Sequence, residues 1–305
     1  MLRAAEALSN GRVLIQDRSI RKDRYGLMRD DSQPSFDVLS SAWTTSFTEF
    51  AASYSPGVLP WGRSLPSASP ADEIPHATTI IVATCAGGVV MAADRRGTSG
   101  NMIVQRDAEK INRVDEFSCV GAAGAGSFGK ELTRLYAVEL EHYEKLQGRS
   151  LSVEGKANRL ATMIRSNLPL AMQGMVVIPI LAAYDETRDA GRIFTYDVGG
   201  GPYETDHFHA IGSGSVFARG AMKKLYREGA SSDEAVFACV QALYDAADDD
   251  SATGGPDVTR KIYPRVAVIT SEGFRLLSDD EVDTHVRRML DGRMSAPDGP
   301  TAPLS

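Results

Sequence analysis

The stretch TTIIVATCAGGVVMAADRR, residues 78–96, decides the fold of this 305-residue chain. Two apolar, β-branched runs flank the short sequence Ala86-Gly87-Gly88. Such runs favour β-strands, and the glycines between them allow a tight turn. The stretch therefore predicts a β-hairpin whose second strand ends at Asp94 and returns that carboxylate towards Thr78.

Beyond the hairpin, the spacing of apolar residues switches between that of strands and that of helices. Further strands are expected at 101–105, 116–124, 175–185, 192–198, 207–212, 263–270 and 274–277. Helices are expected from Phe128 to Gly148, from Leu160 to Pro169, at 215–228, at 231–248 and from Ser278 onwards. The helices at Ser231 and Ser278 open with capping-box patterns. Because strands and helices come in blocks, we predict an α+β fold, a four-layer α-β-β-α sandwich of two antiparallel sheets.

The two ends of the chain differ from its middle. Residues 1–77 hold six prolines and both tryptophans, and no helix or strand period persists in them. The stretch 64–75, SLPSASPADEIP, has the composition of a flexible linker. We expect a pro-segment at 1–77 that is removed on maturation, one catalytic domain at 78–290, and a flexible tail at 291–305. Met28 is an alternative to Met1 as the true start.

Composition excludes several kinds of partner. The net charge of −7 offers no basic field to neutralise phosphates, so no nucleic-acid partner is expected. No apolar run approaches the ~20 residues that span a bilayer, and the charged N-terminus is not a secretory signal. Cys85, Cys119 and Cys239 lie in apolar runs and predict buried, reduced thiols in a cytoplasmic protein. No spacing typical of a zinc site occurs, and neither metal nor cofactor is expected.

The chemistry of a hydroxyl nucleophile needs a nearby base. His142 and His285 fall in helices rich in charge, where a surface position is expected, and no GxSxG motif occurs. A second solution is a threonine made N-terminal by cleavage, because its α-amine has a reference pKa of about 7.7–8.0. That chemistry requires a cleavable junction, a buried cation and a carboxylate that holds the cation. Thr78, Lys110 and Asp94 are the candidates.

At these residues the sequence resembles the β-type subunits of the proteasome, a family of threonine peptidases with the N-terminal nucleophile hydrolase fold. The shared pattern is TTI, then GGV, then A-x-DRR. Asp94 and Lys110 lie sixteen and thirty-two positions after Thr78, as the family's catalytic Asp and Lys follow its threonine. LYAVELEHYEKLQG, GSGS and LYDAADDDSATGGPD resemble the bacterial, actinobacterial-type β subunit. The resemblance covers about 78–290 and extends weakly to TSFTEF at 45–50.

This resemblance implies a role for each matching residue. Thr78 Oγ attacks the scissile carbonyl, and the Thr78 α-amine accepts its proton through a water. Lys110 lowers the local proton affinity, and Asp94 orients Lys110. Matching positions also assign the oxyanion-binding N–H to Gly124 and the placement of the amine and its water to Ser213, Asp250 and Thr253. Pairing with substrate backbone falls to Thr98 and Gly126, and the specificity pocket to Ala122, Gly126 and Lys130.

One position departs from the family pattern. The family has glycine before the cleaved bond, and this chain has Ala77. Glycine permits a tight turn without a Cβ penalty, so alanine is expected to slow cleavage or alter the turn. We still expect cleavage between Ala77 and Thr78.

The resemblance also implies an assembly. Seven identical chains would form a β ring, and two such rings would stack between rings of α-type subunits. An ATPase ring would feed unfolded polypeptide into the barrel. Two alternatives remain: a simpler two-ring threonine peptidase, against which the long pro-segment counts, and a non-catalytic ring subunit. The joint presence of Thr78, Asp94 and Lys110 counts against the second.

Overall fold

A computed structural model describes residues 20–22, 28–30, 44–62 and 78–301. The chain divides into two units, Met1–Thr44 and Thr45–Ser305. In the first unit, strands β1 (Ile20–Lys22) and β2 (Met28–Asp30) pair antiparallel. Most of the expected pro-segment and the whole 64–75 linker lie outside the described residues.

Two five-stranded antiparallel sheets form the centre of the second unit. The first has the order β12 (Phe208–Gly212), β3 (Thr79–Cys85), β4 (Gly88–Ala93), β13 (Arg265–Thr270), β14 (Gly273–Leu276). The second has the order β11 (Pro202–Thr205), β10 (Ala190–Tyr196), β9 (Val177–Asp185), β8 (Ser118–Gly124), β7 (Ile111–Asp115). A separate hairpin pairs β5 (Gly97–Ser99) with β6 (Met102–Gln105).

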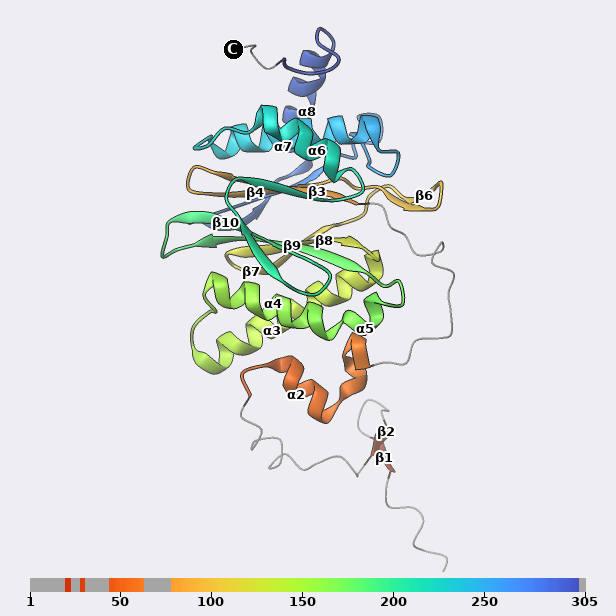
Figure 1. Ribbon diagram of the computed structural model, residues 1–305, viewed down its shortest axis with the longest axis vertical. Helices are drawn as coiled ribbons and strands as arrows, with labels where there is room; N and C mark the ends of the chain where they lie inside the picture. The colour runs from red at the N-terminus through yellow and green to blue at the C-terminus, as the bar shows by residue number, and fades with distance from the viewer. Residues whose placement is uncertain (1–19, 23–27, 31–43, 63–77, 302–305) are drawn as a thin grey trace, which may run out of the picture. The chain divides into compact units, whose positions relative to one another are not determined.

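Helices cover the outer face of each sheet, as Figure 1 shows. The helices α6 (Ser215–Leu225), α7 (Ser232–Asp249) and α8 (Asp279–Arg293) lie over the β3–β4 sheet. On the far side, α3 (Gly126–Gln147), α4 (Val153–Ser166) and α5 (Leu168–Ala171) lie over the β8–β9 sheet. The order of layers is helix, sheet, sheet, helix. The predicted four-layer sandwich is therefore confirmed.

The strand period explains why the opening hairpin is apolar on both faces. Along β3, Ile80 and Val82 pack between the two sheets, whereas Ile81 and Ala83 pack under α6 and α7. Successive side chains of a strand point to opposite faces, so a strand with two covered faces needs a continuous apolar run. The predicted turn is confirmed as well, because β3 and β4 pair from Cys85–Gly88 outwards.

Several expected boundaries shift. Both capping boxes form, at Ser231 and at Ser278. The helix expected to stop at Pro169 ends at Ser166 instead, and Pro169 lies in the first turn of α5, where a missing N–H is tolerated. The last helix extends to Arg293. The short strands β5, β7 and β11 were not anticipated.

A helix also occurs inside the expected pro-segment, where no helical period was recognised. Helix α2 (Phe47–Tyr54) is followed by the short 3₁₀ turns η2 (Pro56–Val58) and η3 (Pro60–Gly62). Ser46 caps α2 by accepting a hydrogen bond from the Glu49 N–H. Residues 45–62 lie against α3, with Ala51 and Leu59 buried and Trp61 packed on the helical core.

Candidate active site

Thr78 immediately precedes β3 and is only 6% exposed. Its carbonyl accepts a hydrogen bond from the Ser213 N–H at 2.9 Å. The next N–H, that of Thr79, donates to Asp94 Oδ1 at 2.7 Å. Both ends of the peptide unit after Thr78 are therefore held, one by the α6 loop and one by the end of β4.

Asp94 and Lys110 form an ion pair next to this peptide unit. Lys110 Nζ donates to Asp94 Oδ1 at 2.6 Å and to the Arg96 carbonyl at 2.7 Å. Asp94 is fully buried and Lys110 is 7% exposed. Asp94 Oδ2 accepts the N–H groups of Arg96 and Gly254, each at 2.9 Å. Four donors thus converge on one carboxylate, which holds the ammonium beside Thr79.

Burial dominates the electrostatics of the lysine. It lowers the pKa of Lys110, and the neighbouring Asp94 carboxylate only partly offsets the effect. Desolvation penalises the charged ammonium, whereas a carboxylate at hydrogen-bond distance favours it. The ammonium therefore loses its proton at a lower pH than an exposed lysine does.

Asp250, Thr253 and Ser213 form a second hydrogen-bonded group beside Thr78. Burial alone raises the pKa of the Asp250 carboxyl, but hydrogen bonds from Ser213 and Thr253 outweigh it and hold the pKa below its ordinary value. Thr253 Oγ1 donates to Asp250 Oδ2 at 2.6 Å, and Thr253 is fully buried. Ser213 Oγ lies 3.5 Å from the Thr78 carbonyl oxygen. The structure thus brings together the residues expected around the amine.

Gly124 ends β8 at a place that only glycine can occupy. Its φ is +104°, a value that side-chain-bearing residues rarely adopt. A Cβ there would lie 2.2 Å from the Val176 carbonyl oxygen. This backbone conformation sets the direction of the Gly124 N–H.

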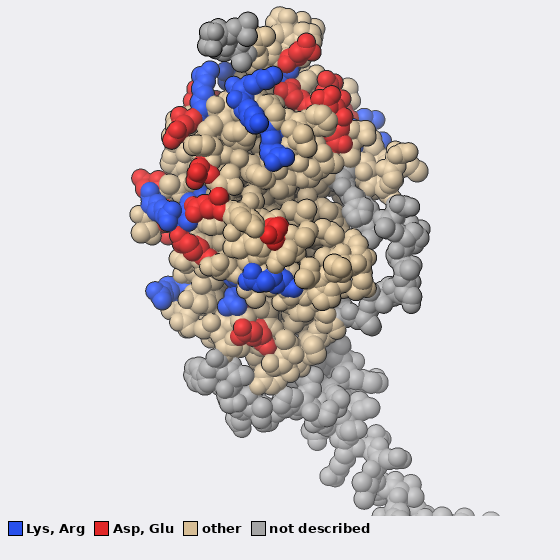
Figure 2. Space-filling model, viewed as in Figure 1, with Lys and Arg blue, Asp and Glu red and all other residues tan. Residues whose placement is uncertain are grey.

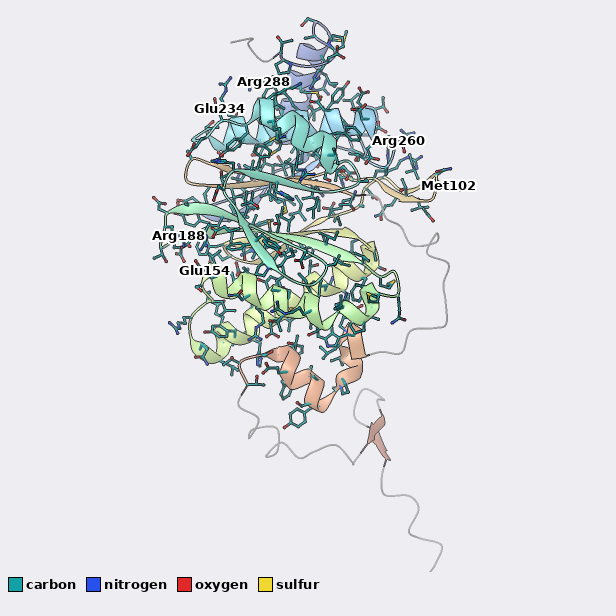
Figure 3. All side chains as sticks on the ribbon, in the orientation of Figure 1. Met102, Glu154, Arg188, Glu234, Arg260 and Arg288 are labelled. Atoms are coloured by element: carbon teal, nitrogen blue, oxygen red, sulfur yellow. The ribbon has the colours of Figure 1, made fainter. Side chains whose placement is uncertain are left out.

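The residues expected to bind substrate lie on two elements. Ala122, Gly126 and Lys130 flank Gly124 along the junction between β8 and α3, and Gly126 is exposed. Thr98 is half-buried in the separate β5–β6 hairpin. Figure 3 shows Met102 at the outer end of that hairpin, where its side chain is 71% exposed.

Reasoning from sequence missed several partners in this site. The N–H groups of Arg96 and Gly254 complete the shell of Asp94, but a backbone donor leaves no signature of side-chain type. Thr79 was also missed. Its one available signal was a hydroxyl at the start of a strand whose next four residues are apolar.

His142, His285 and the three cysteines are not among the candidate site residues. His142 and His285, expected on the surface, are both half-buried, His142 edge-on against Phe47 and His285 3.4 Å from Asp233. The expected buried thiols are found at Cys119 and Cys239, while Cys85 is half-buried, and all three cysteines are free. Burial raises the pKa of each thiol.

Other features of the described residues bear on partners. These residues hold no group of three His, Cys, Asp or Glu suited to a metal ion. No helix among them has both the length and the apolar character needed to cross a membrane.

On the face in Figure 2, the described Lys and Arg side chains are interspersed with Asp and Glu. A cavity of about 660 Å³ lies between α6, α7 and α8 and includes none of the candidate site residues.

The fold and the position of Thr78 at the head of β3 define an N-terminal nucleophile hydrolase sandwich. Comparison with known proteins gives the family. A model described as "Proteasome subunit" matches residues 74–260. A "Proteasome subunit beta" of Streptosporangium roseum is 65% identical over 268 residues, 88% of this chain and 95% of that protein. Proteins of the same description from Acidothermus cellulolyticus and Streptomyces griseus are 57% and 56% identical, over 85% and 86% of this chain and 91% and 93% of theirs.

The chain therefore belongs to the proteasome subunit family, and within it to the bacterial β subunits. It is a proteolytic subunit of the 20S barrel, where it assembles with α subunits. Its activity is that of a peptidase, a class of hydrolase. Ala77, on the other side of the expected cleavage, lies outside the described residues.

Proposed function

We propose that this chain is a threonine-type endopeptidase whose nucleophile, Thr78, is released by autocatalytic cleavage between Ala77 and Thr78. The observation that carries this proposal is the buried pair of Lys110 and Asp94, bonded at 2.6 Å. The same Asp94 oxygen accepts the Thr79 N–H, which places the ammonium next to the nucleophile's own peptide unit. A buried cation there favours ionisation of a hydroxyl and the neutral form of an amine.

The reaction follows from these charges. The Thr78 hydroxyl attacks the scissile carbonyl while its proton passes, through a water, to the Thr78 α-amine. The Gly124 N–H stabilises the oxyanion, a contribution of roughly 2.7–4 kcal/mol in comparable sites. The proton then moves to the leaving amine, the peptide bond breaks, and an ester on Thr78 remains. Water hydrolyses the ester and restores the free hydroxyl.

The surrounding residues have positioning roles in this proposal. Ser213, Asp250 and Thr253 hold the α-amine and its water. Thr98 and Gly126 pair with the substrate backbone as an added strand. Ala122, Gly126 and Lys130 line the pocket for the side chain before the cut bond.

The proposed assembly is a homo-heptameric β ring in the cytoplasm. Two such rings stack between rings of α subunits, and an ATPase ring delivers unfolded polypeptide. Residues 1–77 form a pro-segment that masks the amine until the rings meet. The catalytic domain is 78–290, with residues 291–305 as a tail.

The test is the variant Thr78→Ala, purified as the assembled particle with its α subunits. We expect peptide hydrolysis to fall by at least about 10³-fold, because the nucleophile and its base are one residue. Persistence of hydrolysis would refute the assignment. A particle that is inactive even with Thr78 intact and Thr78 N-terminal would instead favour a non-catalytic ring subunit.

A further inference from the structure

The Thr79 side chain lies in a closed set of hydrogen bonds beside the nucleophile. Thr79 is fully buried, and its Oγ1 accepts the Gly214 N–H at 3.0 Å. The same oxygen lies 2.6 Å from Thr253 Oγ1. Thr253 Oγ1 in turn donates to Asp250 Oδ2 at 2.6 Å. Three side chains and one backbone amide are thus joined in a row.

The number of available protons decides which atom donates in each hydrogen bond of this row. Each hydroxyl has one proton to donate, and an ionised carboxylate can only accept. The pKa of Asp250 is held below its ordinary value, so its carboxylate takes the Thr253 proton. The Thr79 proton therefore points to Thr253, and the Gly214 N–H points to Thr79. Bonds aligned in this way polarise one another and end on a charge.

The hydroxyl groups of Thr79 and Thr253 are tightly packed. A Cβ added to Gly214 would lie 2.5 Å from Thr253 Oγ1 and 2.7 Å from Thr79 Oγ1. Both threonines have no exposed surface. A hydroxyl removed from this row would leave the Gly214 N–H and Thr253 short of a partner.

The row is attached directly to the nucleophile. The Thr78 carbonyl accepts the Ser213 N–H, and the Thr79 N–H donates to Asp94. These two bonds hold the plane of the peptide unit between the two threonines. The Thr79 hydroxyl adds a third attachment, to Thr253 and through it to Asp250.

We propose that Thr79 is a positioning residue for the reaction of Thr78. Its hydroxyl couples the peptide unit of the nucleophile to Thr253 and Asp250. This coupling keeps the Thr78 hydroxyl and amine in register with Lys110 and Asp250. The inference rests on the proposed function of Thr78 and adds a residue to it.

The test compares Thr79→Val and Thr79→Ala, which lack the hydroxyl, with Thr79→Ser, which keeps it. Assembled particles are assayed for peptide hydrolysis at saturating and limiting substrate. We expect kcat to fall about tenfold in the Val and Ala variants, the effect of one lost buried hydrogen bond, with KM changed less than twofold. Thr79→Ser is expected to stay within about threefold of the unaltered particle.

A matched control lies on the same strand. Thr84 also has a bonded hydroxyl, which lies 2.9 Å from the Tyr226 hydroxyl at the far end of β3. Thr84→Val makes the same chemical change away from the site and is expected to leave kcat unaltered. An equal loss in Thr84→Val would overturn the inference, because the effect would then be one of strand stability.

Three further outcomes would overturn the inference. The first is an unchanged kcat in Thr79→Val, and the second is a Thr79→Ser particle as slow as Thr79→Ala. The third is failure of both Val and Ala variants to assemble while Ser assembles, which would assign the hydroxyl to folding. Thr78→Ala in the same assay separates the two proposals. If it stays active the proposed function fails, and if only the Thr79 variants stay active this inference alone fails.

Discussion

Two fully buried carboxylates, Asp94 and Glu139, are held in different ways. Asp94 accepts hydrogen bonds from the Lys110 ammonium and from three backbone N–H groups. Glu139, on α3, accepts only the Thr48 N–H, at 2.8 Å, among the hydrogen bonds described. Its other oxygen lies 3.2 Å from Arg159 Nε without hydrogen-bond geometry to any described residue.

The two carboxylates differ in whether the proposed cleavage would remove their hydrogen-bond donors. All four donors to Asp94 lie in residues 78–301, downstream of the proposed cleavage. The donor to Glu139 belongs to α2, upstream of it, and Phe47 beside that donor packs edge-on against His142. Cleavage and departure of the pro-segment would leave Asp94 unchanged and would deprive Glu139 of its hydrogen-bond donor. Catalysis should therefore depend on the first carboxylate, and stability of the uncleaved chain on the second.

The largest expected effect comes from Asp94→Asn. The change removes the counter-charge of Lys110, so the pKa of the ammonium falls further and its charged form is less favoured. We expect peptide hydrolysis by assembled particles to drop by about 10² to 10³-fold. Glu139→Gln is the matched control in the mature particle and should change hydrolysis less than twofold. Equal losses of peptide hydrolysis in both variants would contradict the proposed difference between Asp94 and Glu139.

A smaller effect is expected from Lys110→Arg, measured as the pH dependence of kcat/KM. In the unaltered particle, activity should rise as the α-amine loses its proton, at a pH below its reference pKa of about 7.7–8.0, because the nearby ammonium favours the neutral amine. It should fall again at high pH as Lys110 loses its proton, below the ordinary lysine pKa of 10.5. Arginine keeps its charge throughout, so the variant should lack the high-pH fall. Because a planar guanidinium cannot reproduce the contacts of the compact ammonium, the variant should also be about tenfold slower. A high-pH limb that survives in Lys110→Arg would assign it to another group.

The smallest effect is expected at Glu139 in the uncleaved chain, measured by thermal unfolding in a Thr78→Ala background. Glu139→Ala leaves the buried Thr48 N–H without an acceptor and should cost about 1–3 kcal/mol. Glu139→Gln retains an acceptor oxygen and should cost about half as much or less. In the mature chain, which lacks Thr48, Glu139→Ala should cost less than in the uncleaved chain. The same loss in both forms would show that α2 contributes nothing at this position.

The parts of the fold that sequence predicts are those with their own local signal. The β3–β4 hairpin has a continuous apolar run and a glycine turn, and both capping boxes use side chains three residues apart. Helix α2 escaped prediction because its eight residues are too few to show a helical period, and its stability comes from packing against α3. Short strands such as β5 likewise depend on a neighbour rather than on their own period.

The residues of the candidate site also differ in whether the sequence carries a signal for them. The sequence indicates Thr78, Asp94 and Lys110 because their residue types suit one chemistry and their spacing matches that of the family that the chain resembles. The backbone donors from Arg96 and Gly254 could not be predicted, since any residue type supplies an N–H. Thr79 could not be distinguished from other strand threonines until its bond to Thr253 was located.

The central claim is that one residue, Thr78, supplies both nucleophile and base once its amine is free. The most direct measurement is the intact mass, with N-terminal sequencing, of the β chain taken from active assembled particles. We predict a chain that begins at Thr78, with Ala77 and everything before it gone. An active particle whose β chains all retain residues upstream of Thr78 would contradict the account.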